Sequence, residues 1–325
     1  MIGDLDKGVK HSNVSSFADD TRITSVIKSH ADSKNLQEDL NSIISWANNN
    51  MRFNSEKFEL IRYENNECLK QQPYHANEQE ITEKDNLRDL GIHLNNKLTY
   101  QEHIDNITMM ANQQVGWILR TFRSRKPEHL LPLWKSLVLS RLEYVCQVWA
   151  PNKISDIEQI EQTQRVFTRK LNLGVEQDYW KRLKTLKIYS VQRRRERYSI
   201  IYTWKILENL VPNPTSQNSV QITGQHHQRF GRTCYRNTLE GVSQRLRSLH
   251  ACSFTFEGPR LFNCLPRDIR GLTNCSIEVF KRHLDKFLQG VPDEPPIRHA
   301  PATRAAASNS LPDQVDYLKR AGGVQ

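Results

Sequence analysis

Amphipathic segments with helical spacing fill the middle of the chain and limit the folds that it can adopt. Between residues 101 and 211 apolar side chains recur every three to four positions, as in helices with one buried face. The spacing predicts helices over 101–122, 127–149, 155–171, 179–187 and 191–210. A capping box from Ser155 to Glu158 is expected to start the third of these helices, and Ser190 to cap the last. Residues 1–97 instead contain short runs that are typical of strands, together with one helix. The sequence therefore predicts an α+β chain.

The 325 residues are enough for two or three domains. Composition and periodicity divide them into an N-terminal part over 1–97 and a basic helical domain over 98–211. We expect a linker over 212–228, which is rich in Asn, Gln, Ser and Pro, and a small unit over 229–290. The Pro/Ala/Ser-rich tail over 291–325 is expected to be disordered.

Two adjacent aspartates, Asp19 and Asp20, lie near the N-terminus after an aromatic and a small residue. The pattern predicts a β-hairpin with strands over Val14–Ala18 and Thr21–Ile27 and the two aspartates at its tip. Aspartate is favoured in turns, so a solvated turn is one interpretation, and the pair alone favours it. Paired carboxylates on a turn also suit a Mg²⁺ site.

A helix and a short strand are expected between this hairpin and the helical domain. Asp32 or Ser33 is predicted to cap a helix that runs to about Asn48. Its apolar face is expected to consist of Leu36, Leu40, Ile43, Ile44 and Ala47. A strand is predicted over Leu87–His93.

The charge of the chain is concentrated in its middle. The formal net charge is +10, and residues 115–205 hold 19 Lys and Arg against 8 Asp and Glu, an excess of 11. The remainder of the chain is therefore close to neutral. A basic segment of this kind indicates a polyanionic partner and favours a nucleic-acid groove built from one domain.

The cysteines and the hydropathy pattern indicate the compartment. Six widely separated cysteines include no Cys-x-x-Cys pair, and no zinc-ligand set is completed by histidines. Scattered single cysteines are typical of a reducing compartment. The N-terminus has no apolar core of a signal peptide, and no apolar run approaches eighteen residues. We expect an intracellular protein of the nucleus or cytoplasm that is neither secreted nor membrane-spanning.

An ordered series of motifs then resembles the reverse transcriptases of non-LTR retrotransposons of the jockey and chicken-repeat kind. The hairpin is similar to the aromatic-Ala-Asp-Asp palm signature, and Asn54-Ser55-Glu56-Lys57 is similar to the next palm motif. Leu90-Gly91-Ile92 resembles the start of the thumb. Further similar motifs are Leu142-Glu143-Tyr144, Val148-Trp149-Ala150-Pro151, Gln164-Arg165-x-Phe167-Thr168-Arg169, Tyr179-Trp180-Lys181-Arg182-Leu183, Arg193-Arg194-Arg195 and Phe262-Asn263-Cys264-Leu265-Pro266. The resemblance covers roughly residues 1–290, and the order is more specific than any single motif.

The resemblance implies a partial polymerase palm followed by a mainly helical thumb and C-terminal region of an RNA-directed DNA polymerase. It implies Asp19 and Asp20 as catalytic Mg²⁺ ligands, Lys57 as proton donor to the pyrophosphate, and an RNA template and DNA primer as partners. Contacts to the template–primer backbone are expected from the basic side chains of the thumb-like domain. The candidates are Arg123, Arg125, Lys126, Arg165, Arg169, Lys181, Arg182, Arg193, Arg194 and Arg195. For the arginine run from 193, the solvated face of a helix is the simpler interpretation.

The chain departs from this family at its N-terminus. Eighteen residues precede Asp19, and the family requires a further catalytic aspartate on a palm strand many residues upstream. We therefore expect a C-terminal part of such a polymerase, with weak or absent Mg²⁺ binding and no polymerase activity from this chain alone. The alternatives are a non-catalytic nucleic-acid-binding module and a transposon relic.

Overall fold

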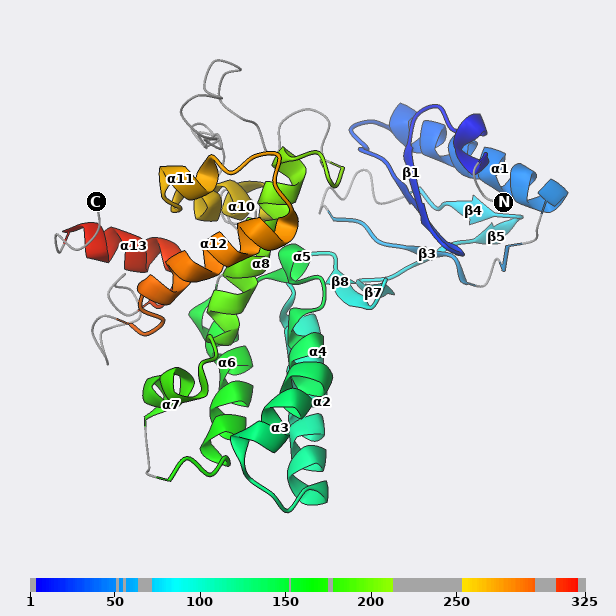
Figure 1. The fold of residues 1–325 in the computed structure, drawn as a ribbon. Coiled ribbons are helices and arrows are strands. Elements are labelled where there is room, and N and C mark those ends of the chain that lie inside the picture. The colour runs from blue at the N-terminus through cyan, green and yellow to red at the C-terminus, as the bar shows by residue number, and fades with distance from the viewer. Residues whose placement is uncertain are drawn as a thin grey trace. The chain divides into compact units, whose positions relative to one another are not determined.

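The structure is a computed structural model that describes residues 4–50, 53–54, 57–63, 72–151, 153–174, 178–212, 253–295 and 308–320 (Figure 1). It is α+β, with many helices and several two-stranded sheets. The chain divides into two compact units, Met1–His103 and Ile104–Gln325. Nearly all of the expected linker over 212–228 and the first part of the expected 229–290 unit lie outside the described residues.

The predicted aspartate hairpin is present, with its tip one residue earlier than expected. Strand β1 (Asn13–Phe17) pairs antiparallel with β2 (Asp20–Thr24), and Phe17 lies opposite Asp20. Ala18 and Asp19 form the two-residue tip, and Ala18 has a φ of 54°. A positive φ at the first tip residue matches the twist of the flanking strands, which explains the shift. Asp20 is thus the first residue of β2, and this strand ends at Thr24 instead of Ile27.

Helix α1 (His30–Asn50) has the predicted apolar face but begins earlier than predicted. Ser29 Oγ accepts a hydrogen bond from the Asp32 amide at 3.4 Å, and the Asp32 carboxylate accepts from the Ser29 amide at 2.8 Å. This reciprocal pair is a capping box, so Ser29 and not Asp32 or Ser33 is the N-cap. The predicted face is confirmed: Leu36 is partly buried, and Leu40, Ile43, Ile44 and Ala47 are buried.

The rest of the first unit contains short strands. Strand β3 (Glu59–Leu60) pairs in parallel with β6 (Thr82–Glu83), and β4 (His75–Ala76) pairs antiparallel with β5 (Gln79–Glu80). The strand predicted over Leu87–His93 is wrong, because β7 (Asn86–Asp89) and β8 (Ile92–Asn95) form a hairpin there. Its tip residues Leu90 and Gly91 have φ values of 45° and 85°, as a type I′ turn requires.

Helices build the second unit (Figure 1). They are α2 (Gln101–Thr121), α3 (Pro127–Leu133), the π-helix Trp134–Leu139, α4 (Ser140–Glu143), α5 (Cys146–Trp149), α6 (Ile154–Arg169), α7 (Tyr179–Leu186), α8 (Val191–Leu207), α10 (Phe254–Asn263), α11 (Arg267–Arg270), α12 (Ile277–Gly290) and α13 (Leu311–Arg320). None of the helices in the described ranges has the length and apolar character needed to cross a membrane.

The helix predicted over 127–149 is divided into shorter pieces. Pro132 lies inside α3 and has no amide hydrogen to donate, and a π-helical turn follows it at Trp134–Leu139. A second break occurs where Val145 takes the left-handed conformation, with a φ of 48°. Trp134 and Leu142 are buried as predicted, whereas Val145 and Val148 are exposed because the break turns them outward.

The cap predicted at Ser190 is confirmed, because Ser190 Oγ accepts from the Arg193 amide at 3.0 Å. At the start of α7 the Asp178 carboxylate accepts from the Lys181 amide at 3.1 Å, a cap that was not predicted. The capping box predicted from Ser155 to Glu158 is wrong. Helix α6 begins at Ile154, and the Ser155 hydroxyl donates to the neighbouring Asp156 carboxylate at 2.9 Å.

The core of the second unit extends into the C-terminal segment. Trp204 of α8 stacks on Phe280 of α12, with ring centroids 4.7 Å apart, and its indole N–H donates to the Leu272 carbonyl. Leu311 and Val315 of α13 are buried in the same cluster. The expectation of a disordered tail over 291–325 is therefore wrong for 291–295 and 308–320. Composition alone missed the short amphipathic helix that lies within this tail.

Candidate nucleic-acid interface

The aspartate hairpin is well exposed. Asp19 and Asp20 are both exposed, and Phe17 beside them has 68% of its surface accessible. Ser16 and Thr21, which face each other across the strands, share a hydrogen bond of 3.1 Å between their hydroxyl groups. The hairpin therefore holds its two carboxylates toward solvent.

A buried carboxylate on α1 anchors the segment that leads into this hairpin. Asp39 is only 2% exposed, and its two oxygens accept hydrogen bonds from the Lys10 and His11 amides at 2.9 Å each. At the other side, Arg22 of β2 forms an ion pair with Asp89 of β7. These contacts fix the hairpin to the rest of the first unit. Asp39 was not among the predicted site residues, since a single aspartate on a helix gives no sequence signal for this role.

The described residues do not fit a complete Mg²⁺ site. Asp19 and Asp20 come from one turn, and no group of three or more His, Cys, Asp or Glu side chains in the described ranges could hold a metal ion. Mg²⁺ binds well only where several oxygen ligands converge. Lys57 is exposed, and its amide donates to the Asn54 carbonyl at 3.1 Å. No hydrogen bond or ion pair among the described residues joins Lys57 to either aspartate.

The arginine run of α8 faces the protein and not solvent, so the predicted solvated face is wrong for this run. Arg193 is fully buried and donates to the carbonyls of Val291, Pro292 and Asn309 at 3.3, 2.9 and 3.2 Å. Arg195 is 4% exposed, and burial lowers its pKa. Neither guanidinium can reach a phosphate backbone in this structure.

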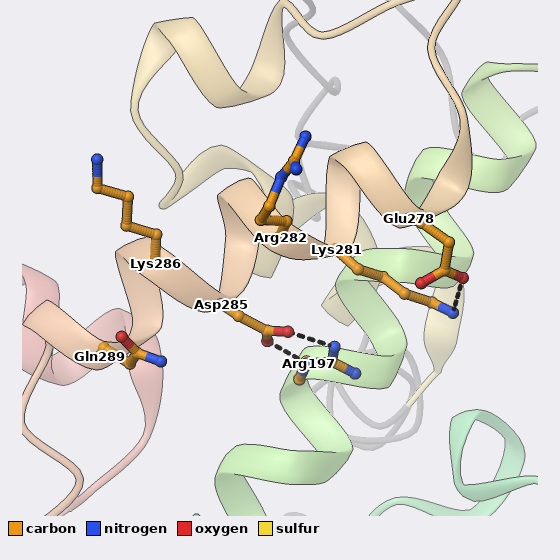
Figure 2. Close-up of a pocket in the computed structure, with 7 residues that line it drawn as sticks. All are labelled: Arg197, Glu278, Lys281, Arg282, Asp285, Lys286 and Gln289. Carbon is orange, nitrogen blue, oxygen red and sulfur yellow. Dashed lines mark hydrogen bonds and ion pairs between the residues drawn. The ribbon is translucent and has the colours of Figure 1, made fainter.

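Arg194 and Arg197 also make internal ion pairs. The Arg194 guanidinium contacts both carboxylate oxygens of Glu143, the last residue of α4. The Arg197 guanidinium donates to both oxygens of Asp285 at 2.5 and 2.8 Å. This second pair, drawn in Figure 2, lies beside an open hollow that Arg197 of α8 and side chains of α12 line. The volume of the hollow is about 440 Å³. Bidentate pairs of this kind fix helix positions, which explains why these arginines are not surface cations.

A buried carboxylate joins α6, α7 and α8. The Tyr179 hydroxyl donates to Glu161, and the Val191 and Gln192 amides donate to the two Glu161 oxygens at 3.1 and 3.2 Å. Burial raises the pKa of Glu161 and raises the pKa of Tyr179 well above its usual value. Glu161 therefore caps the first turn of α8 and sets the position of α7 beside α6.

The remaining predicted cations gather at one end of the second unit. The Asn172 amide donates to the Arg125 carbonyl at 2.8 Å, so the α2–α3 connection lies against the segment that follows α6 (Figure 1). We use the name basic end for five of the exposed cations on this connection, around the end of α6 and on α7, and leave out Lys184 of α7 because it pairs with Glu294. The five are Arg123, Lys126, Arg169, Lys170 and Lys181. Four of the five were predicted; Lys170 was not.

Three other predicted arginines make hydrogen bonds or cation–π contacts within the protein at this end. Arg125 donates to the carbonyls of Leu119 and Phe122 at 2.5 Å each, which closes the α2–α3 connection. The Arg165 guanidinium lies over the Tyr179 ring at 4.7 Å and the Trp180 ring at 5.7 Å. Arg182 lies 5.7 Å from the Tyr179 ring centroid. Cation–π contacts hold these two guanidinium groups in place beside the exposed cations.

The acidic side chains near the basic end neutralise little of its charge. Lys126 lies 3.7 Å from Glu128, and Lys181 lies 4.0 Å from Asp178, with both lysines about two-thirds exposed. Exposed ion pairs at such distances contribute little, because water screens them. Arg165 has a closer partner in Glu158, at 3.1 Å. The surface as a whole keeps a positive charge that can attract a polyanion.

Comparisons of the chain with protein-family models, with curated proteins and with solved structures found no match.

Proposed function

We propose that this chain is the C-terminal part of an RNA-directed DNA polymerase of the non-LTR retrotransposon type, and that its helical unit binds a template–primer duplex. The basic end is the observation that carries the binding proposal. Five exposed cations come from three segments that a backbone hydrogen bond and cation–π contacts link, and neighbouring arginines are fixed on aromatic rings. Such a surface contacts phosphates without reading sequence. Binding is therefore expected to tolerate changes of sequence.

The aspartate hairpin supports the polymerase part of the proposal. Its two carboxylates lie at the end of a short hairpin that a buried aspartate anchors. A polymerase needs a further carboxylate from a separate strand to hold its metal ions. The proposal therefore assigns nucleic-acid binding, and no catalysis, to this chain by itself.

A binding measurement tests the first part. Fluorescence anisotropy with a labelled RNA–DNA duplex compares the full chain with the triple variant Lys126→Gln, Arg169→Gln and Lys181→Gln. The control carries the same loss of three charges outside the basic end, at Lys286, Lys319 and Arg320, which are all exposed. We expect the basic-end variant to lose affinity and the control to bind like the unmodified chain. Equal losses in both variants would refute a localised interface.

A primer-extension assay on an RNA template with Mg²⁺ and deoxynucleotides tests the second part. The expected result is no extension above an Asp19→Ala control. Extension by the unmodified chain that the Asp19→Ala change abolishes would show that the chain is a catalytic polymerase by itself.

A further inference from the structure

Two aromatic rings are exposed at the C-terminal end of α2, Trp117 within the helix and Phe122 directly after its last residue. Trp117 has 46% of its surface accessible and Phe122 has 37%. Their ring centroids lie 6.4 Å apart, and the planes are nearly perpendicular at 82°. Large aromatic side chains are usually buried, and Trp134, Trp149 and Trp204 of the same unit are fully so. This pair therefore needs an explanation beyond folding.

Two arginines lie close to these rings along the chain. Arg120 follows Trp117 by three positions, so both lie on the same side of the helix. Its guanidinium lies over the backbone of Gly116, where an added Cβ would come within 3.3 Å of Arg120 Nη1. Arg120 and Arg123 are both exposed. An apolar surface flanked by arginines complements a ligand that combines flat rings with negative charge.

We propose that Trp117 and Phe122 form a stacking platform for an unpaired base, with Arg120 and Arg123 on its backbone. This inference rests on the proposed function and adds a preference for single-stranded segments. Inside a duplex each base is covered by its neighbours, so only unpaired or terminal bases offer a free face for stacking. Phe122 directly precedes Arg123 of the basic end. A strand held there can pass its unpaired bases onto the platform.

The test compares two nucleic acids on the full chain. The first is a single-stranded RNA of about twelve nucleotides, within the range of sites of this type, and the second is the blunt RNA–DNA duplex that contains it. The variants are Trp117→Ala, which removes the ring, and Trp117→Phe, which keeps an aromatic face. Met109→Ala is the matched control, since Met109 is 52% exposed on the same helix. Circular dichroism and the elution volume on gel filtration check folding and association.

We expect Trp117→Ala to weaken single-strand binding roughly tenfold or more, because stacking on one aromatic side chain contributes that much. Duplex binding by this variant and both affinities of Met109→Ala should stay unchanged. Trp117→Phe should keep most of the affinity but lose the quenching of tryptophan emission by the single strand.

Two outcomes would overturn the platform. Trp117→Ala that binds the single strand as well as the unmodified chain does would exclude stacking at this position. Self-association of the unmodified chain that Trp117→Ala abolishes would assign the rings to a contact between copies. The proposed function itself would fail differently, through an unmodified chain that binds neither nucleic acid.

Discussion

Both carboxylate oxygens of Glu196 on α8 accept hydrogen bonds from the backbone amide of Leu311, at 3.0 and 3.1 Å. Leu311 is the first residue of α13, where a backbone amide has no acceptor within the helix. The buried carboxylate on α8 supplies that acceptor. Arg193 and Asn309 add a second hydrogen bond between the same two segments. The C-terminal helix is thus held by charge and hydrogen bonds as well as by apolar packing.

Leu311→Ala should destabilise the second unit by about 2–5 kcal/mol, since it removes a fully buried side chain and leaves a cavity. Urea unfolding followed by tryptophan emission measures this, because three buried tryptophans report on that unit. Tyr317→Ala on the same helix is the control. Tyr317 is 46% exposed, and its replacement should change stability by no more than about 0.5 kcal/mol. A stability in urea that Leu311→Ala leaves unchanged would contradict the packing of α13 against the second unit.

The stability of the second unit should fall between about pH 5 and 7. Burial raises the pKa of Glu196 from 4.5 to about 7, against the opposing effect of Arg193. The folded form therefore binds the proton more tightly than the unfolded form does. This contribution is fully present below pH 4.5 and is lost as the pH rises through the folded pKa, a loss of up to about 3 kcal/mol.

Glu196→Gln separates this group from the others, because glutamine does not titrate but can still accept from the Leu311 amide. The variant should show a shallower loss of stability between pH 5 and 7, measured by urea unfolding at several pH values. Superimposable pH profiles for Glu196→Gln and the unmodified chain would exclude Glu196 as the source.

The arginines of α8 should affect stability and leave nucleic-acid binding unchanged. Arg194→Ala leaves Glu143, which is 10% exposed, without its bidentate partner, at a cost of about 1–3 kcal/mol. The double variant Arg194→Ala/Glu143→Ala should recover part of this loss. RNA–DNA duplex affinity, measured by anisotropy, should stay within about twofold of the unmodified chain, a shift under 0.5 kcal/mol. A large loss of duplex affinity in Arg194→Ala would show that Arg194 belongs to the binding interface.

Asp39→Asn should destabilise the first unit by about 1–3 kcal/mol, since one amide of the Lys10–His11 pair loses its buried acceptor. Glu38→Gln is the matched control, because Glu38 is exposed on the same helix and the change removes the same charge. Hydrogen exchange of the Lys10 and His11 amides measures the effect. Equal protection in Asp39→Asn and the control would rule out the anchoring role.

Local patterns carried the predictions that were confirmed. The apolar face of α1, the cap Ser190 and the existence of the aspartate hairpin depend on residues within a few positions of one another. The π-helical turn after Pro132 and the left-handed Val145 were missed because spacing does not report a break inside a helix that stays apolar.

The arginines of α8 show why the interface could be predicted only in part. Their partners Glu143, Asp285 and Asn309 lie 51, 88 and 116 positions away along the chain. A run of arginines has the same sequence signal whether its partner is a phosphate or a distant carboxylate. The cations of the basic end have only weak ion-pair partners nearby. A count of charges along the sequence does not distinguish these exposed cations from the buried arginines of α8.

The salt dependence of duplex binding tests the basic end most directly. The logarithm of the binding constant should fall linearly with the logarithm of salt concentration, with a slope that loses about one unit for each phosphate contact removed. The triple variant at Lys126, Arg169 and Lys181 should therefore have a slope about three units shallower than the unmodified chain. The control at Lys286, Lys319 and Arg320 should keep the full slope. A slope that is the same in all three proteins, or flat in the unmodified chain, would contradict the proposed interface.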